Sequence, residues 1–335
     1  MNDEAVTRQY PIADLHCDLL HYLATMPGAD PGNTEAIGCA IPHLVEGNVK
    51  LQVMAIASVE AEPEPSITER QIQWYERLST ESGNSFLSLS RAEEVVGMIK
   101  RQGTGMVTAV ESAGALCAND DPIDTAFARL EEIVSRCGKP LYISLTHHGE
   151  TRFGGGNFTD IGLKPDGRAL IDYLDGRGIA VDLSHTSDRL AFDILEHVDA
   201  GDLKIPIIAS HSNYREVYDH RRNLPDELAK EVVRRNGLIG LNFLRAFVDP
   251  ENADTLTRHL EHGFALGGES AVCFGADYFC IGSHPDQSRR PFFHEGHENA
   301  GRYQSILGIW SLHLDEKSLG NISFDNVAEF MRKNW

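Results

Sequence analysis

Residues 168–211 read RALIDYLDGRGIAVDLSHTSDRLAFDILEHVDAGDLKIPIIASH. Apolar residues at helical spacing predict helices over Arg168–Arg177 and Asp188–Val198. Each helix is followed by a short β-rich apolar run, Ile179–His185 and Pro206–His211. Neither run has the strict apolar/polar alternation of a strand with one exposed face, so both strands are expected to be covered on both sides. Helices that alternate with such strands indicate a parallel sheet.

The same alternation extends over the rest of the chain. The other predicted strands are Ile12–Asp18, Leu51–Val59, Gly105–Glu111, Leu141–His147, Leu238–Leu244 and Ala271–Asp277. The other predicted helices are Ile67–Ser82, Arg91–Arg101, Pro122–Arg136, Pro225–Arg235 and Thr255–Leu266. Eight strands in this pattern predict an α/β fold of the closed (β/α)₈ TIM-barrel type.

An open, doubly wound sheet is the alternative architecture. It requires a glycine-rich turn after the first strand, and the sequence DLHCDLLHY at that point has no glycine. The 335 residues are therefore interpreted as one barrel domain, 1–335. A long polar loop is expected at about residues 282–302, and an amphipathic helix over Phe324–Trp335 is expected to close the chain.

The charge balance excludes one class of partner. Fifty acidic residues against 30 basic ones give a net charge of -20, which argues against nucleic-acid binding. The N-terminal sequence MNDEAVTRQYPIADLHCD has no basic start followed by an apolar run, and no long apolar stretch predicts a membrane span. From these features we expect a cytoplasmic location with reduced cysteines. The six cysteines form no C-x-x-C pair, which argues against a zinc-finger or thioredoxin motif.

Residues able to bind metal ions fall at the carboxyl ends of the predicted strands. In a (β/α)₈ barrel these ends meet on one face, which carries the active site. Chance placement would instead scatter such residues among helices, loops and the opposite strand ends. The residues are His16, Asp18, Glu111, His147, His185, His211 and Asp277.

The spacing of these residues predicts a site for divalent cations. His16 and Asp18 are two residues apart on a strand, so both side chains point the same way. Glu111 ends the apolar run MVTAVE, where an unpaired carboxylate would be costly. His185 and His211 each follow a serine on neighbouring strands. Histidines and carboxylates without thiolates suit zinc or a similar ion.

Other residues at this face allow several roles. Asp277 is interpreted as a ligand, a general base or a structural ion-pair partner, and His147 as a group that orients substrate or stabilises an oxyanion. His148 should point away from His147 because strand side chains alternate. Asp14 shares the face of His16 but lies deeper, and is interpreted as a structural residue.

Several segments resemble one known family, the membrane (renal) dipeptidases of peptidase family M19, among the amidohydrolase-like metal-dependent hydrolases. They lie between residue 14 and about residue 280, and GRGIAVDLSHTS and RRNLPDEL are the most specific of them. The segments are DLHCDLL, AVESAGAL, ISLTHH, GLKPDGRALIDYLDGRGIAVDLSHTS, IIASHSN, RRNLPDEL, LIGLNF and FGADY.

The resemblance implies a function for each residue of the predicted site. Two zinc ions (Zn²⁺) are implied, one held by His16 and Asp18 and the other by His185 and His211, with Glu111 as the bridging ligand. His147 would contact the substrate and stabilise the tetrahedral intermediate, Arg222 would bind the substrate carboxylate, and Asp277 would shuttle the proton.

The implied reaction is hydrolysis of a dipeptide amide by a hydroxide held between the metals. The implied substrates carry a free C-terminal carboxylate, L,D-dipeptides among them, and the implied assembly is a homodimer.

The chain departs from the family pattern near the predicted pocket. Asp277 is followed by Tyr278-Phe279-Cys280, where the family usually has Asp-Phe-Asp-Gly. Asn242-Phe243-Leu244 stands where a tyrosine is often found. These differences leave open an alternative reaction on N-acyl amino acids, lactones or esters. A barrel that binds a ligand without turnover is a third interpretation, and it would require a broken ligand position.

Overall fold

The computed structural model describes residues 9–58 and 65–335, and its eight main strands are all parallel. They follow the order β7-β6-β5-β4-β2-β1-β9-β8, and a short strand, β3 (Phe86–Ser88), pairs with β4 outside this path. The eight strands are β1 (Ile12–Cys17), β2 (Val49–Ala57), β4 (Thr104–Glu111), β5 (Tyr142–Ser144), β6 (Ala180–Asp182), β7 (Ile207–Ile208), β8 (Ile239–Leu241) and β9 (Val272–Phe274).

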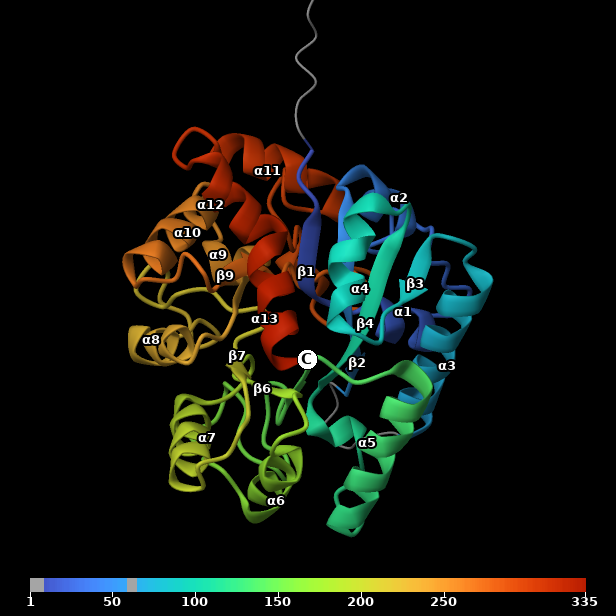
Figure 1. Ribbon diagram of the computed structural model, residues 1–335, viewed down its shortest axis with the longest axis vertical. Helices are drawn as coiled ribbons and strands as arrows, with labels where there is room; N and C mark the ends of the chain where they lie inside the picture. The colour runs from blue at the N-terminus through green and yellow to red at the C-terminus, as the bar shows by residue number, and fades with distance from the viewer. Residues whose placement is uncertain (1–8, 59–64) are drawn as a thin grey trace, which may run out of the picture.

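The two ends of this sheet meet, so the strands form a barrel (Figure 1). A parallel bridge joins Ala209, just after β7, to Ile239 at the start of β8. The Ala209 N–H donates to the Leu238 carbonyl and the Gly240 N–H donates to the Ala209 carbonyl, both at 2.8 Å. The predicted (β/α)₈ barrel is confirmed.

Glycine permits close approach where the barrel closes. A Cβ atom at Gly240 would lie 1.9 Å from the Ser210 carbonyl oxygen, and one at Gly275 would lie 2.0 Å from the same atom. Such distances are far inside van der Waals contact, so only residues without a side chain fit at these positions. Because these two glycines have no side chain, β8 and the segments after β7 and β9 can lie close together.

Regular strands end earlier than predicted on the carboxyl side of the barrel. The predicted strand Ile179–His185 is β6, Ala180–Asp182, and the predicted Ala271–Asp277 is β9, Val272–Phe274. Three residues beyond these strand ends, His185 and Asp277 adopt positive φ values, 68° and 65°, which are outside the strand region. Val59, the last residue of another predicted strand, lies outside the described residues.

Helices surround the barrel, and the predicted ones are present with small shifts at their ends. They are α3 (Pro65–Glu81), α4 (Ala92–Gly97), α5 (Ile123–Cys137), α6 (Pro165–Leu174), α7 (Asp188–Ala200), α8 (Asp226–Arg234), α10 (Thr255–Ala265) and α13 (Asn326–Asn334). The sequence did not predict the shorter helices α1 (Leu19–Thr25), α2 (Ile41–Glu46), α9 (Arg245–Val248), α11 (Tyr303–Trp310) and α12 (Glu316–Gly320).

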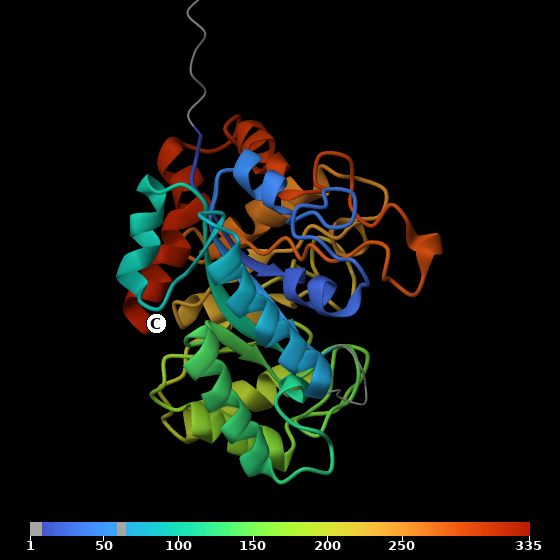
Figure 2. The same ribbon diagram turned by 90° about the vertical axis from the view of Figure 1, so that its right-hand side faces the viewer.

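The C-terminal part of the chain lies at both ends of the barrel. Between residues 282 and 302 the only helical pieces are two short 3₁₀ turns, Gln287–Arg289 and Ala300–Arg302, and part of this segment projects at the right of Figure 2. Helix α13 lies on the opposite side. The Trp335 indole N–H donates to the Lys139 carbonyl at 3.1 Å, which ties the last residue to the loop before β5.

Within residues 9–58 and 65–335, no helix combines the length and the apolar character needed to cross a lipid bilayer.

Candidate metal centre and active site

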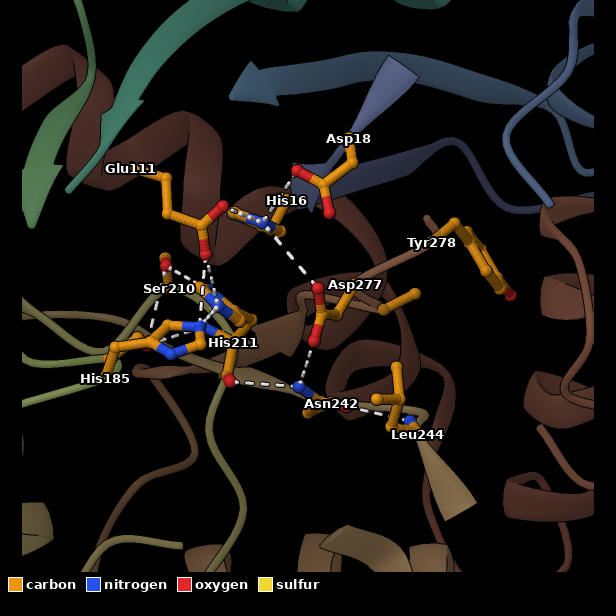
Figure 3. Close-up of polar contacts among 12 residues, drawn as sticks. His16, Asp18, Glu111, His185, Ser210, His211, Asn242, Leu244, Asp277 and Tyr278 are labelled. Atoms are coloured by element: carbon orange, nitrogen blue, oxygen red, sulfur yellow. Dashed lines mark hydrogen bonds and ion pairs between the residues drawn. The ribbon is translucent and has the colours of Figure 1, made fainter. Parts of the chain in front are cut away.

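Most of the predicted site residues converge at the carboxyl ends of the strands; Figure 3 shows His16, Asp18, Glu111, His185, His211 and Asp277. Three groups of His, Asp and Glu side chains have possible ligand atoms within 4.8 Å of one another. All members of these groups except His148 belong to the predicted site. The groups are His16 with Glu111 and His211, His16 with Asp18 and Asp277, and His147 with His148 and His185.

His16 is held with one ring nitrogen free. The Tyr142 hydroxyl donates to the Leu15 carbonyl at 3.0 Å, so it accepts the proton on His16 Nδ1 at 2.7 Å. The other nitrogen, Nε2, then faces the site, and this buried atom has no hydrogen-bond partner among the described residues. In its neutral form an imidazole held in this way would present the Nε2 lone pair to a cation.

Carboxylates crowd around the free nitrogen of His16. Its Nε2 lies 3.5 Å from Glu111 Oε2, 3.7 Å from Asp277 Oδ1 and 4.0 Å from Asp18 Oδ1. Burial lowers the pKa of His16, but these three carboxylates outweigh it and raise the pKa to about 10. The three carboxylates therefore stabilise positive charge at this point, and a bound cation would supply that charge.

Glu111 stands between two sets of histidines. Its Oε1 lies 3.1 Å from His185 Nε2 and 3.4 Å from His211 Nε2, while its Oε2 faces His16. Burial raises the pKa of this carboxyl, but the charge on His16 and the nearby nitrogens of His185 and His211 hold the pKa well below its usual range. The Glu111 carboxylate thus presents Oε1 to His185 and His211 and Oε2 to His16.

His211 is oriented by a buried relay of hydrogen bonds. The Ser210 hydroxyl donates to Asp182 Oδ2 at 2.6 Å, so it accepts from His211 Nδ1 at 2.6 Å. The lone pair of His211 Nε2 then lies 3.0 Å from His185 Nε2. His185 Nε2 can supply at most one proton to the two acceptors beside it, His211 Nε2 and a Glu111 oxygen, whereas a divalent cation could bind all three atoms.

The donor atoms suit zinc in kind, because they are imidazole nitrogens and carboxylate oxygens. Burial lowers the pKa of His185 and His211 well below the usual value, so both rings are neutral, which is the form that binds metals. Asp14 lies below the cluster and accepts from the backbone N–H groups of His16 and Ala276 and from the Tyr303 hydroxyl. Its expected structural role matches these contacts.

Asp277 occupies the rim of the cluster. Its Oδ1 faces His16, and its Oδ2 accepts from the Asn242 amide at 2.8 Å. Burial is the main reason why its pKa rises to about 6; His16 opposes the shift and Glu111 adds to it. The Asn242 amide oxygen in turn accepts from the Leu244 N–H at 2.7 Å.

Arg222 is buried beside the cluster without a carboxylate partner in the described part of the chain. Its guanidinium donates to Ser212 Oγ at 2.8 Å and to the His211 carbonyl at 2.9 Å, and its Nε has no partner there. Phe247 lies 5.6 Å from its charged carbon. A buried cation that is bound only by neutral groups is suited to an anionic ligand group.

His147 lies with its ring centroid 4.3 Å from that of His185, and burial lowers its pKa to about 3. The prediction that His148 points away from it is wrong, because the two ring centroids are 4.1 Å apart. Regular strand ends at Ser144, so the alternation of side chains no longer applies at residues 147 and 148. His148 Nδ1 bonds Asn157 Oδ1 at 2.9 Å.

Sequence reasoning missed the residues that orient the histidines, Tyr142, Asp182 and Ser210. A signal existed for two of them. Asp182 shares a strand face with Ser184, and Ser210 is the serine noted before His211. Tyr142 gave no signal, because its contact with His16 spans 126 residues.

The fold and this cluster define a (β/α)₈ barrel with a candidate metal centre on its carboxyl face. The model of the membrane dipeptidase family, peptidase family M19, matches residues 2–332. The chain therefore belongs to the membrane dipeptidase family.

Curated relatives and solved structures are similar to the chain. It is 36% identical over 196 residues to the uncharacterized dipeptidase C3A11.10c of Schizosaccharomyces pombe, covering 56% of this chain and 44% of the relative. It is 25% identical over 252 residues to the uncharacterized dipeptidase C965.12 of the same organism, covering 72% and 55%. The matched segments thus span about half the length of these relatives.

One similar fold is that of a metallopeptidase from Rhodobacter sphaeroides liganded with a phosphinate mimic of the dipeptide L-Ala-D-Ala. Its TM-score is 0.83 at 19% identity, and the match covers 98% of this chain and 100% of that one. The dipeptidase AC, a metallopeptidase of family M19, gives a TM-score of 0.81 at 20% identity, with 98% and 99% covered.

Proposed function

We propose that the chain is a metallo-dipeptidase that binds two Zn²⁺ ions and hydrolyses short peptides with a free C-terminal carboxylate. The observation that carries the proposal is the buried meeting of the Nε2 atoms of His16, His185 and His211 around Glu111, with His16 Nε2 lacking any hydrogen-bond partner in the described chain. His16 and Asp18 would hold one ion, His185 and His211 the other, and Glu111 would contact both. When bound, the ions supply Lewis acidity and make a water molecule acidic enough to lose a proton near neutral pH.

The surrounding side chains would position the peptide and move its protons. Arg222 can bind the terminal carboxylate with its free Nε–H, which fixes one end of a short substrate. The N–H of a neutral His147 can donate to the carbonyl oxygen as negative charge develops there. Asp277 can accept the proton of the attacking water and pass it to the leaving amine, so that the amide C–N bond breaks with no net change in protonation.

A substrate of the L,D-dipeptide type is part of this proposal. The related metallopeptidase of Rhodobacter sphaeroides has been seen with a mimic of L-Ala-D-Ala, which supports an L,D-dipeptide here. Family membership also supports a homodimer, which sedimentation analysis of the purified chain would test. A cytoplasmic location stays a prediction.

The decisive experiment compares metal-stripped with zinc-reloaded protein on four substrates: L-Ala-D-Ala, L-Ala-L-Ala, an N-acyl amino acid and a lactone. The proposal predicts that a chelator abolishes dipeptide hydrolysis and that zinc restores it. Asp277→Asn should retain zinc and lose roughly 100-fold or more in kcat. Full activity without metal would refute the proposal, and a preference for the acyl or lactone substrate would replace the dipeptide with that class.

A further inference from the structure

A cavity lies near the candidate metal centre. Its volume is about 290 Å³, and its lining includes Leu244, Arg245, His220, Arg289 and Phe292. This volume is below the range of a pocket for a drug-sized ligand and suits one amino-acid side chain.

Two arginine side chains line this cavity without an ion pair to any carboxylate of residues 9–58 and 65–335. The Arg245 and Arg289 guanidinium groups form no hydrogen bond to these residues either, and the hydrogen bonds of both arginines are made by the backbone, with Phe292, Asp249 and Asp286. The Asp286 carboxylate accepts instead from the N–H and hydroxyl of Ser288. In a chain of net charge -20, two arginines in one hollow without an ion pair to a carboxylate of the described residues point to an anion that is not part of the protein.

A chain of hydrogen bonds links the cavity wall to Asp277. Asn242 donates to Asp277 Oδ2 and accepts from the backbone N–H of Leu244, which lines the cavity (Figure 3). Leu244 stands in the segment where the family often has a tyrosine. The wall between the metal centre and the cavity thus differs from the family pattern at this point.

The cavity also adjoins the proposed carboxylate-binding arginine. The backbone N–H of Arg222 donates to His220 Nδ1 at 3.1 Å, and His220 lines the cavity. The ring of Phe247 contacts both residues, 5.0 Å from the His220 ring and 5.6 Å from the Arg222 charge. A substrate whose terminal carboxylate meets Arg222 would therefore have the side chain of its C-terminal residue beside this cavity.

We propose that the cavity is a subsite for an acidic side chain, so that the enzyme prefers dipeptides whose C-terminal residue is aspartate or glutamate. The inference rests on the proposed function for the placement of the substrate, and on Arg245 and Arg289 for the charge. Guanidinium groups bind carboxylates in two-point contacts, and the apolar Leu244 and Phe292 would pack against the methylene groups of such a side chain.

The first test compares Ala-Asp with Ala-Asn and Ala-Glu with Ala-Gln, in L,L and L,D forms, on the zinc-loaded chain. Each pair differs in charge and hardly in shape. The acid should be cleaved with the higher kcat/KM, and Arg289→Gln or Arg245→Gln should lower the acid-to-amide ratio about 10-fold, the size expected for a hydrogen bond to a charged group. Added salt should reduce the same ratio because Arg289 is exposed.

Arg101→Gln is the matched control, since Arg101 is exposed at the opposite end of the barrel, just before β4, and it should leave the ratio unchanged. A parent ratio of one or less overturns the subsite. So does a ratio that both cavity variants leave intact, or a preference for Asp-Ala over Ala-Asp.

A second test needs no turnover and separates this inference from the proposed function. Calorimetry on the whole chain compares the binding of aspartate with that of asparagine, the amino acids that such substrates would release. Tighter binding of aspartate that is lost in Arg289→Gln supports the subsite even if no dipeptide is cleaved. Equal binding of the two amino acids overturns it, whether or not the neutral dipeptides are hydrolysed.

Discussion

The hydroxyl group of Tyr142 determines which nitrogen of His16 faces the cluster. It donates to the Leu15 carbonyl and so can only accept from His16 Nδ1. Ser210 does the same for His211 through Asp182. The proposed metal centre therefore depends on neutral groups behind the ligands as much as on the ligands themselves.

Tyr142→Phe removes this control of His16 while keeping the ring in place. We expect the affinity for zinc to fall roughly 10- to 100-fold, the usual effect of losing a hydrogen bond behind a metal ligand. Competition with a zinc chelator measures the change. Tyr75→Phe is the control, because that buried hydroxyl bonds Ser88 and the Met106 carbonyl, away from the cluster. Equal zinc affinity in the two variants would contradict the role given to Tyr142.

At the scale of elements, the segment after β5 carries His147 and His148 and folds back on itself. The Gly156 N–H donates to the Gly149 carbonyl at 2.8 Å, and the Asn157 N–H donates to the His185 carbonyl at 2.8 Å. A Cβ at Gly156 would lie 2.1 Å from the His147 carbonyl oxygen. The glycine is therefore needed for the segment to pack against the two histidines.

Gly156→Ala should displace this segment and lower the free energy of unfolding by about 1–3 kcal/mol, as overpacking usually does. Activity should fall as well, because His147 moves with its backbone. Gly149→Ala is the matched control in the same segment, since a Cβ there meets nothing within 4 Å. Urea unfolding and dipeptide assays of both variants test this, and equal behaviour of the two would refute it.

Helix α10 carries a buried histidine that should make the fold sensitive to acid. His259 is buried; its Nε2 donates to the Val248 carbonyl at 3.0 Å and its Nδ1 accepts from the Tyr214 N–H at 3.3 Å, so the ring is neutral. Burial lowers its pKa to about 4, against 6.5 in an unfolded chain. Unfolding therefore takes up a proton between these values, and stability falls as the pH falls through this window.

Between pH 7 and pH 5 this histidine should account for a loss of about 2 kcal/mol in the free energy of unfolding. Urea titrations at both pH values for the parent and for His259→Gln isolate its share, because other groups cancel in the difference. The exposed His313→Gln is the control variant. If the parent and His259→Gln lose the same stability, the buried neutral histidine is not the cause.

At the scale of the whole molecule, a single sheet contains all the strands from β1 to β9. The indole N–H of Trp335 also donates a hydrogen bond to the Lys139 carbonyl. We propose that residues 1–335 form a single domain, and we predict one cooperative unfolding transition in urea. Circular dichroism and tryptophan fluorescence should give the same midpoint, since Trp74, Trp310 and Trp335 lie in different parts of the chain. Two separated midpoints would show independent parts.

The barrel was predictable because strand and helix patterns alternate along the sequence and do not depend on long-range contacts. The convergence of His16, Glu111, His185 and His211 followed from the same pattern, since parallel strands end on one face. The orientation of His148 and the cavity with Arg245 and Arg289 were not predictable. Both depend on how irregular segments fold over the barrel ends, and periodicity carries no information there.

Metal analysis of the purified parent chain and of Glu111→Gln tests the central claim most directly, with Glu132→Gln on helix α5 as the control. A two-metal centre around Glu111 predicts about two zinc equivalents and dipeptidase activity in the parent and in the control. Glu111→Gln should lose at least one equivalent together with its activity. A parent that takes up no zinc, or a Glu111→Gln variant that keeps both ions and full activity, would contradict the account.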